Sequence, residues 1–482
     1  MLLRFWVSNF LSFDSECEFS MIADGREQIH RDHIYHFSSE KHFHALRSTL
    51  FYGANASGKT NFVRALAMAK NIIIKGTSGD ESLPFKPFKL KKGANKTPTC
   101  FEFEFHYQGK NYRYGFKYDD QYFSEEWLIV FTKHSEEPLF VRGNKAHWDK
   151  EFKNKISWLN NDTSFGFGRW YNQQKNEERD FLRFVFKGTR PNQLFLKESI
   201  ERNVNFFRPA YNWFRDALEV ISPNSVATGL EHNLTTNPDL ENFLSELLRN
   251  ADTGIDHIQA FKSKPEDITD IPHDIREKIS SDIKDDKTII QIQGPGNQRY
   301  TFSKDKNGVL QIHRLVAGHE IKGSPEPVYF EISEESDGTC RLIDLGPAIN
   351  ELINTKNERV IVIDELERSL HPHLSRMLLE LHLHNNGKDT PSQLIATTHD
   401  DGLMDLKLLR RDELWFVRKN DDQSSELFSL SEFSPRFDKH IRKDYLSGRY
   451  SAIPYISSLA RLRSDKSFAY DSKKKQKPKE TP

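Results

Sequence analysis

The most informative stretch of this chain is FYGANASGKT, at residues 51–60. It follows the apolar segment LRSTLFY at 46–52, which is typical of a buried strand, and precedes NFVRALAMAKNIII at 61–74, whose apolar spacing predicts a helix. The pattern G-x-x-x-x-G-K-[ST] is met in full by Gly53, Gly58, Lys59 and Thr60. A loop of this kind between a strand and a helix predicts a phosphate site, because its amides and the positive end of the helix both face the anion.

Each side chain of this loop has an expected task in binding ATP. Lys59 is expected to reach the β- and γ-phosphates, and the Thr60 hydroxyl is expected to ligate Mg2+. Gly53 and Gly58 allow backbone angles that other residues resist, so that successive amides point toward the phosphates. The loop therefore predicts a working nucleotide site.

A second segment supplies the carboxylates that such a site needs. ERVIVID, at 358–364, is a nearly continuous apolar run, typical of a central parallel strand buried on both faces. It ends in Asp364, the expected Mg2+ ligand, and Glu365 follows, well placed to polarise the attacking water. About 35 residues further on, His399 follows the apolar run QLIATT and is a candidate polar switch near the γ-phosphate.

A third element lies upstream of the carboxylate strand. Ser336 and Gly338 stand in a short polar turn before an apolar helix, which makes another helix N-terminus suited to an anion.

Composition limits the other possibilities. The 482 residues predict two or three domains. The 69 basic and 70 acidic side chains leave no overall field that attracts nucleic acid or membranes, so any such binding needs a local patch. Three scattered cysteines exclude a disulfide framework or a CxxC zinc site. No apolar run approaches the roughly 20 residues that span a bilayer, so we expect a cytoplasmic protein without membrane contact.

The chain is expected to have an α/β fold in four segments. Residues 1–149 hold the phosphate loop and an antiparallel meander, whose strands are expected at 100–107, 111–118 and 126–132. Residues 150–285 are expected to form an inserted helical lobe, and residues 286–462 contain the carboxylate strand. The lysine-rich tail at 463–482 is expected to be disordered.

Together these segments resemble the ATPase head of the ABC superfamily, in its branch with SMC, RecF and OLD proteins. GANASGKTN resembles the Walker A motif, VIVIDE the Walker B motif, His399 the switch histidine and ESDGT, at 335–339, the LSGGQ signature. NFLSF, PFKL, YRYGFKYDD, SEEWL, ELERSLHP, RRDELWFV and YLSGRYSAIPYI resemble more specifically the AAA-fifteen-type ATPases of bacterial abortive-infection and phage-defence systems, such as the RloA and AbiL ATP-binding subunits.

The resemblance implies an ABC-ATPase head that uses ATP and Mg2+. It adds Asn55, Ser57 and Asn61 to the nucleotide contacts of the loop. It implies a signature at Ser336, Asp337 and Gly338 that acts on the nucleotide of a second subunit, and a D-loop with Ser369 and His371, where His371 stands in place of the usual aspartate. The implied assembly is a homodimer or higher oligomer with ATP between its heads.

The function implied is an ATP-hydrolysing sensor subunit of an anti-phage, abortive-infection defence system. It is expected to respond to a phage protein or to DNA and to control a separate toxic effector, such as a nuclease. Two alternatives stay open on the sequence: a DNA-repair ATPase of the RecF kind that clamps DNA directly, and a scaffold that binds ATP without hydrolysis. Metal binding by the histidine groups at 30–44 and 371–384 is a further, weaker alternative.

Overall fold

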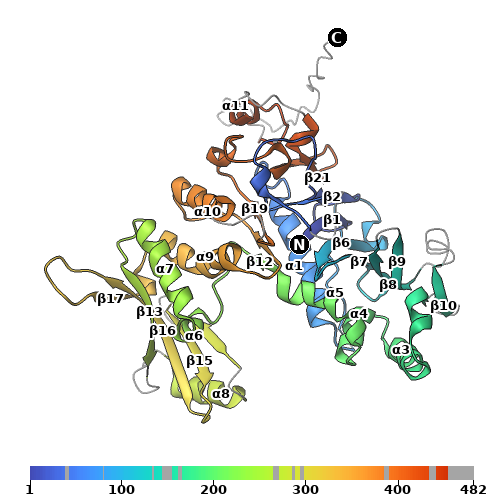
Figure 1. Cartoon of the computed structure of the whole chain (residues 1–482), viewed down its shortest axis with the longest axis horizontal. Helices are drawn as coiled ribbons and strands as arrows, with labels where there is room; N and C mark the ends of the chain where they lie inside the picture. Colours follow the sequence, from blue (N-terminus) through green and yellow to red (C-terminus); the bar gives the residue numbers. More distant parts are fainter. Residues whose placement is uncertain are drawn as a thin grey trace, which may run out of the picture.

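The computed structural model describes residues 1–37, 43–79, 81–132, 135–143, 155–160, 165–263, 271–284, 288–293, 298–384, 390–433 and 441–453. Figure 1 shows a central region flanked by an antiparallel sheet on the right and a smaller domain on the left. None of the helices in the described ranges is long and apolar enough to cross a membrane. The fold is mixed α/β, as expected.

The central sheet has six strands in the order β12-β18-β19-β5-β20-β21. Their bounds are β12 Leu218–Ile221, β18 Arg359–Ile363, β19 Ser392–Thr397, β5 Ser48–Tyr52, β20 Leu414–Lys419 and β21 Ser425–Ser429. All neighbours pair in parallel except β20 and β21, which are antiparallel. The strands predicted before the phosphate loop and before Asp364 are thereby confirmed, and their carboxyl ends lie at one edge of the sheet.

The second sheet is antiparallel and has eight strands in the order β10-β11-β9-β8-β7-β6-β1-β2. The strands are β1 Leu2–Ser8, β2 Cys17–Ser20, β6 Thr99–Tyr107, β7 Lys110–Tyr118, β8 Phe123–Phe131, β9 Glu136–Arg142, β10 Ile156–Asn160 and β11 Phe165–Gly168. The predicted three-stranded meander is confirmed as β6-β7-β8, inside a larger sheet. A short pair, β3 (Ile34–Tyr35) and β4 (Ala45–Leu46), lies apart from both sheets.

Helix α1, Lys59–Lys75, packs between the two large sheets. Phe62 of α1 is fully buried, and its ring centroid lies 4.6 Å from that of Phe51 in the parallel sheet and 5.8 Å from that of Phe5 in the antiparallel sheet. Aromatic pairs at such distances add specific geometry to apolar burial. The antiparallel sheet therefore positions α1, and with it the phosphate loop at the start of this helix.

The smaller domain consists of an antiparallel sheet with helices packed on it. Its strands are β13 His257–Ser263, β14 Ile290–Gln293, β15 Arg299–Lys304, β16 Leu310–His319 and β17 Val328–Glu331. Its helices are α6 Leu230–Thr236, α7 Pro238–Asn250 and α8 His273–Asp282. Helix α9, Asp337–Asn354, connects it to the central sheet, and a side chain at Gly346 would collide with Leu244 of α7.

The expectation of a helical lobe over residues 150–285 is only partly met. Helices α3 Asn176–Gly188, α4 Phe195–Glu201 and α5 Arg208–Asn212 lie in this range, but so do strands of all three sheets, β10 to β13. Residues 218–221 lie within the range expected to be helical, yet Leu218–Ile221 forms β12 beside β18. Tertiary pairing overrides local propensity there, because β18 offers a free edge. The domain boundaries stay a prediction, and the tail lies outside the described residues.

The remaining α-helices of the described residues are α10 Pro372–His384 and α11 Ile441–Leu446. A π-helix at Trp213–Ala217 follows α5, and short 3-10 turns lie between other elements.

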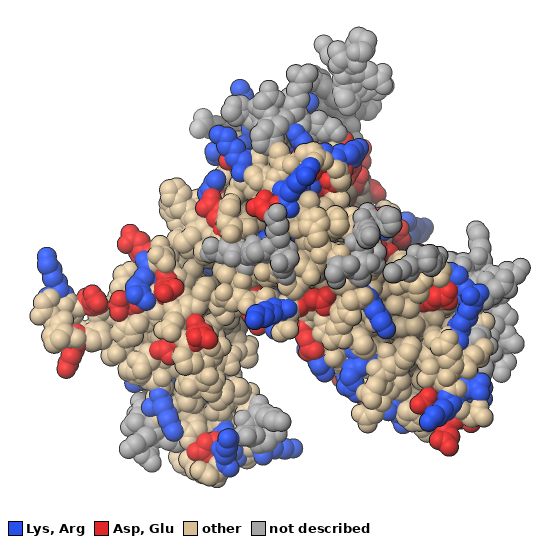
Figure 2. All heavy atoms as spheres, viewed as in Figure 1, with Lys and Arg blue, Asp and Glu red and all other residues tan. Residues whose placement is uncertain are grey.

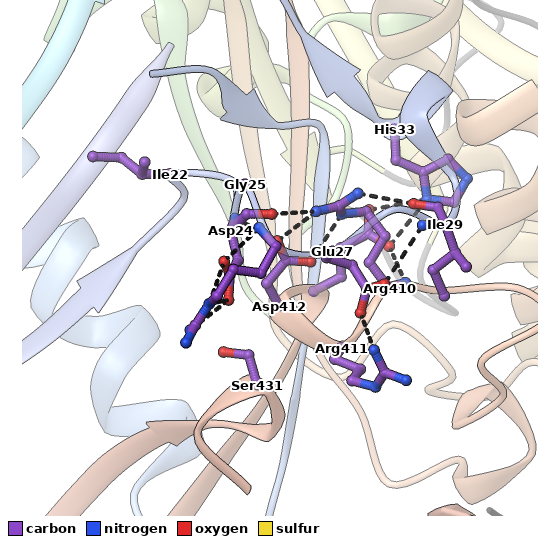
Figure 3. A network of polar contacts seen from close by, with 12 residues as sticks. Ile22, Asp24, Gly25, Glu27, Ile29, His33, Arg410, Arg411, Asp412 and Ser431 are labelled. Carbon is purple, nitrogen blue, oxygen red and sulfur yellow. Dashed lines mark hydrogen bonds and ion pairs between the residues drawn. The ribbon is translucent and has the colours of Figure 1, made fainter. Parts of the chain in front are cut away.

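A buried polar network joins the N-terminal segment to the strand β20 (Figure 3). The Arg410 side chain is fully buried and donates to both carboxylate oxygens of Asp412 at 2.8 and 2.7 Å, and also to the carbonyl of Ile29 at 2.8 Å. Asp412 in turn accepts from the Asp24 amide at 2.7 Å. The network fixes a loop without regular structure to the central sheet.

We predict that Arg410→Met strongly destabilises the protein. The substitution leaves the Asp412 carboxylate buried without its partner, which typically costs about 3–5 kcal/mol. Urea unfolding measures the loss. Arg26→Met is the matched control, since Arg26 also pairs with Asp24 in this loop but is largely exposed. It should unfold like the wild type, and an equal loss in both variants would contradict this assignment.

Candidate nucleotide-binding site

The predicted phosphate loop connects β5 to α1, and its backbone packs closely against β21 and Ser12. At Gly58 the backbone φ is +120°, and an added Cβ would lie 2.2 Å from the Ser425 hydroxyl oxygen. That hydroxyl donates to the Ser57 carbonyl at 2.6 Å. Ala56 also has a positive φ of 59°, which is uncommon outside glycine. Asn61 donates to the Ser12 hydroxyl at 2.9 Å. The loop conformation is therefore fixed by β21 and by residues near the N-terminus.

Lys59 lies over the loop that precedes it. Its ammonium donates to the carbonyl of Gly53 at 2.7 Å and to that of Ala54 at 3.3 Å. Burial lowers the pKa of Lys59 to about 8, although three carboxylates act in the opposite direction, those of Glu367, Asp364 and Glu365. Among the described residues this buried ammonium bonds only to its own loop, so it is able to exchange those carbonyls for phosphate oxygens.

A pocket of about 840 Å3 opens over this loop. Its lining includes the loop residues Asn55, Ser57, Gly58, Lys59, Thr60 and Asn61, and also His399. Residues 85–90, which contain the PFKL motif, also line it. Ser12, Arg64, Lys419 and Gln423 also line it. The sequence did not indicate any of the four as a site residue, although Ser12 belongs to the NFLSF motif.

Asp364 and Thr60 form a pair of oxygen ligands suited to Mg2+. Asp364 is 1% exposed, and its Oδ1 lies 3.4 Å from the Thr60 hydroxyl. The same Oδ1 accepts from the Thr397 hydroxyl at 2.6 Å. Hydroxyl and carboxylate oxygens are the donors that Mg2+ prefers. These residues fit the metal that the sequence predicts.

Thr397 also fixes the residue next to Asp364. Its hydroxyl oxygen accepts from the Glu365 amide at 2.8 Å, and Glu365 has a positive φ of 54°. Such strained backbone persists where surrounding contacts hold it, often at functional sites. Sequence reasoning did not single out Thr397, although it ends the predicted strand before His399.

His399 lies at the end of β19 near the same carboxylates. Its amide donates to Glu367 at 2.6 Å. Burial, and then the neighbouring Lys59 charge, lower the pKa of His399, which favours the uncharged imidazole. The second oxygen of Glu367 is buried and has no hydrogen-bond partner within the described part of the chain. Glu367 is thus a further acidic group of the site that the sequence did not indicate.

The signature-like turn and the D-loop-like turn contact each other. The Ser336 hydroxyl caps α9 by accepting from the Thr339 amide at 3.1 Å. An added Cβ at Gly338 would lie 2.7 Å from the carbonyl oxygen of Ser369. Asp337 and His371 are both exposed. Among the described residues, none of this group lines the pocket over the phosphate loop of the same chain.

Arg341, one turn into α9, is a charged group that no motif predicted. It is 6% exposed, and in the described structure none of its three guanidinium nitrogens has a hydrogen-bond partner. Burial lowers the pKa of Arg341, and Asp344, Glu365 and Asp364 act against that effect. A buried cation without hydrogen bonds is costly, and the nearby carboxylates of Asp344, Glu365 and Asp364 offset part of that cost.

The structure adds little support for metal binding by the histidine groups. His30, Asp32 and His33 bring ligand atoms within 4.8 Å of one another, but the Nδ1 of His33 is already paired with Glu413 at 3.0 Å. His42 lies outside the described residues. Metal binding at these groups stays a prediction.

The strand, phosphate loop and helix, with acidic residues on a neighbouring parallel strand, define a P-loop ATPase domain. Residues 48–405 match the family described as AAA domain, putative AbiEii toxin, Type IV TA system, and the chain belongs to that family. The match includes the phosphate loop, Asp364 and His399, and it implies the use of ATP and Mg2+. No match is found among curated proteins.

We predict that ATP binding weakens as pH rises above about 8. There the free Lys59 amine loses its proton, and ATP has to restore it, so affinity falls by about tenfold per pH unit. Calorimetry at about pH 9 in two buffers of different ionisation enthalpy should detect uptake of about one proton. Lys59→Arg keeps its charge and should take up none. A flat affinity profile for the wild type would contradict the prediction.

We predict that Thr397→Val impairs the metal site more than the phosphate site. Loss of a buried hydroxyl bonded to a carboxylate costs about 1.5–3 kcal/mol, or roughly ten- to a hundredfold in affinity. The Kd of ATP with Mg2+ should rise by such a factor, while the Kd without Mg2+ changes little. Thr397→Ser retains the hydroxyl and should behave like the wild type. Equal losses with and without Mg2+ would place the role of Thr397 elsewhere.

Proposed function

We propose that this chain is an ATP-hydrolysing, ABC-type regulatory subunit of an anti-phage, abortive-infection defence system, which controls a separate toxic effector such as a nuclease. The observation that carries the proposal is the gathering of Lys59, Thr60, Asp364, Glu365 and His399 at one edge of a parallel sheet. These are the groups that phosphoryl transfer to water requires: a phosphate-binding cation, metal ligands and a base.

In this proposal each side chain has one role. Lys59 and the amides at the start of α1 bind the phosphates, and Thr60 and Asp364 hold Mg2+, which neutralises phosphate charge when bound. Glu365 orients and polarises the attacking water, in a position that Thr397 fixes through the Glu365 amide. The uncharged His399 is able to hydrogen-bond a γ-phosphate without adding charge.

We further infer that two heads share each nucleotide. The Ser336 turn caps a helix of 18 residues and is exposed, yet it does not line the pocket of its own chain within the described structure. A helix N-terminus with free amides is suited to phosphate, so this turn is available to a nucleotide bound by a second copy. ATP would then join two heads, and hydrolysis would release them.

The defence role is supported by the family, whose description names a toxin and a toxin–antitoxin system. A regulatory role fits that description. The central sheet of the chain carries the ATPase site, and an assembly that depends on ATP is able to bind an effector in one nucleotide state and release it in another. A phage protein or DNA would be the trigger. Two alternatives predict different biochemistry: a RecF-like clamp binds duplex DNA with strong salt dependence, and an ATP-bound scaffold shows no turnover.

We predict that Glu365→Gln, with ATP and Mg2+, forms a stable dimer that sedimentation velocity detects, whereas Lys59→Ala stays monomeric. The amide cannot act as the base, so nucleotide persists between the heads, while removal of the lysine prevents binding. Wild-type protein should hydrolyse ATP and dimerise only transiently. A Glu365→Gln protein that stays monomeric with ATP bound would sink the two-head proposal, and wild type without turnover would favour the scaffold.

A further inference from the structure

A projecting hairpin leads directly into the signature-like turn. This arm, residues 316–331, consists of the end of β16, the connecting turn and β17, and it extends from the left of the molecule in Figure 1. Only the four residues Ile332–Glu335 separate β17 from Ser336. The root of the arm therefore lies next to whatever surface receives Ser336.

The arm exposes apolar side chains in an unusual way. Val328, Tyr329 and Phe330 follow one another on β17 and are 41%, 40% and 40% exposed. Successive residues of a strand point to opposite faces, so both faces of β17 are incompletely covered. The turn adds Ile321, which is 48% exposed. Contiguous exposed apolar side chains of this kind mark an interaction site.

The arm and its root are also strongly acidic. Between residues 320 and 337 the chain has six acidic side chains and one lysine. Glu331 and Glu335 are paired within the domain, with Arg314 and His319 respectively. Glu320 and Glu326 are exposed and lie on the turn. Red carboxylates are visible along this projecting end at the left of Figure 2. A partner surface should accordingly be basic with some apolar character.

The same molecule has such a surface beside its phosphate loop. Residues 86–96, KPFKLKKGANK, form a lysine loop with five lysines and no acidic residue, and all five lysines are exposed. Leu90 within it is 68% exposed. The first part of the lysine loop, residues 86–90, lines the pocket over the phosphate loop. The lysine loop thus adjoins the nucleotide site, and the arm adjoins the signature-like turn.

We propose that the arm of one copy of this chain docks on the lysine loop of a second copy. The proposal rests on the proposed function, in which Ser336 of one copy meets the nucleotide of the other. In that arrangement each surface adjoins one half of the shared site, the arm at the Ser336 turn and the lysine loop at the phosphate loop. Their charges are opposite and both expose apolar side chains. In a two-fold dimer the contact occurs twice, so the surface is self-complementary.

Charge reversal tests this pairing directly in the Glu365→Gln background. One variant adds Glu320→Lys and Glu326→Lys to the arm, and the other adds Lys92→Glu and Lys96→Glu to the lysine loop. None of these four residues lines the pocket in the described structure. Each variant alone places like charges in both contacts, so we expect its ATP-dependent dimerisation to weaken by about tenfold or more at low salt.

A mixture of the two variants should restore the dimer. In the mixed pair a basic arm meets an acidic loop at one contact, and an acidic arm meets a basic loop at the other. Sedimentation velocity with one variant fluorescently labelled should therefore detect mixed dimers of near-parental affinity, weakening with salt. Recovery on mixing also shows that both variants are folded.

The outcomes separate this inference from the proposed function. If the Glu365→Gln parent fails to dimerise with ATP, the two-head proposal itself is wrong. If the parent dimerises but neither variant weakens it, or the mixture shows no recovery, the arm does not dock on the lysine loop. In that case the arm contacts another partner, such as the effector.

Discussion

The arrangement of the whole site depends on the hydroxyl of Thr397. It donates to Asp364 at 2.6 Å and accepts from the Glu365 amide at 2.8 Å, so a single side chain on β19 fixes both acidic residues that follow β18. Because β19 lies between β18 and β5, it also sets the separation between these acids and the phosphate loop. The backbone strain at Glu365 is tolerated because this contact and the parallel pairing over-determine it.

The rest of the fold holds the carboxyl edge of the parallel sheet, where the site lies, in place. The parallel sheet is buried on both faces, with Val360 and Val362 in the core around α1, and Ile361 and Ile363 in the core around α9 and α10. The eight-stranded antiparallel sheet covers α1, and the network around Arg410 fastens the N-terminal segment to β20. Helix α9 then links the site to the smaller domain. The signature-like turn, Arg341 and the arm therefore all belong to this helix or to the segments next to it.

Sequence patterns predicted the parts of the site that depend on local order. The glycine-lysine loop follows one apolar strand and the acidic pair follows a second apolar strand, so local sequence determines the conformation of each. The structure brings Lys59, Thr60, Asp364 and His399 together. Thr397, Glu367, Arg341 and Ser12 were missed because their importance comes from neighbours far along the chain. The segment Leu218–Ile221 was misjudged for the same reason, since its strand conformation is set by the edge of β18.

The central claim is that a complete site needs the phosphate loop of one copy and the Ser336 turn of another. Complementation between inactive variants measures this most directly. Lys59→Ala lacks a working phosphate loop, and Ser336→Arg blocks the turn, so each should be nearly inactive in ATP hydrolysis alone. In a one-to-one mixture each mixed dimer has one intact site, formed by Lys59 of one variant and Ser336 of the other, so turnover should recover to at most about half of the wild-type value. Full activity of Ser336→Arg alone, or no recovery on mixing, would contradict the account.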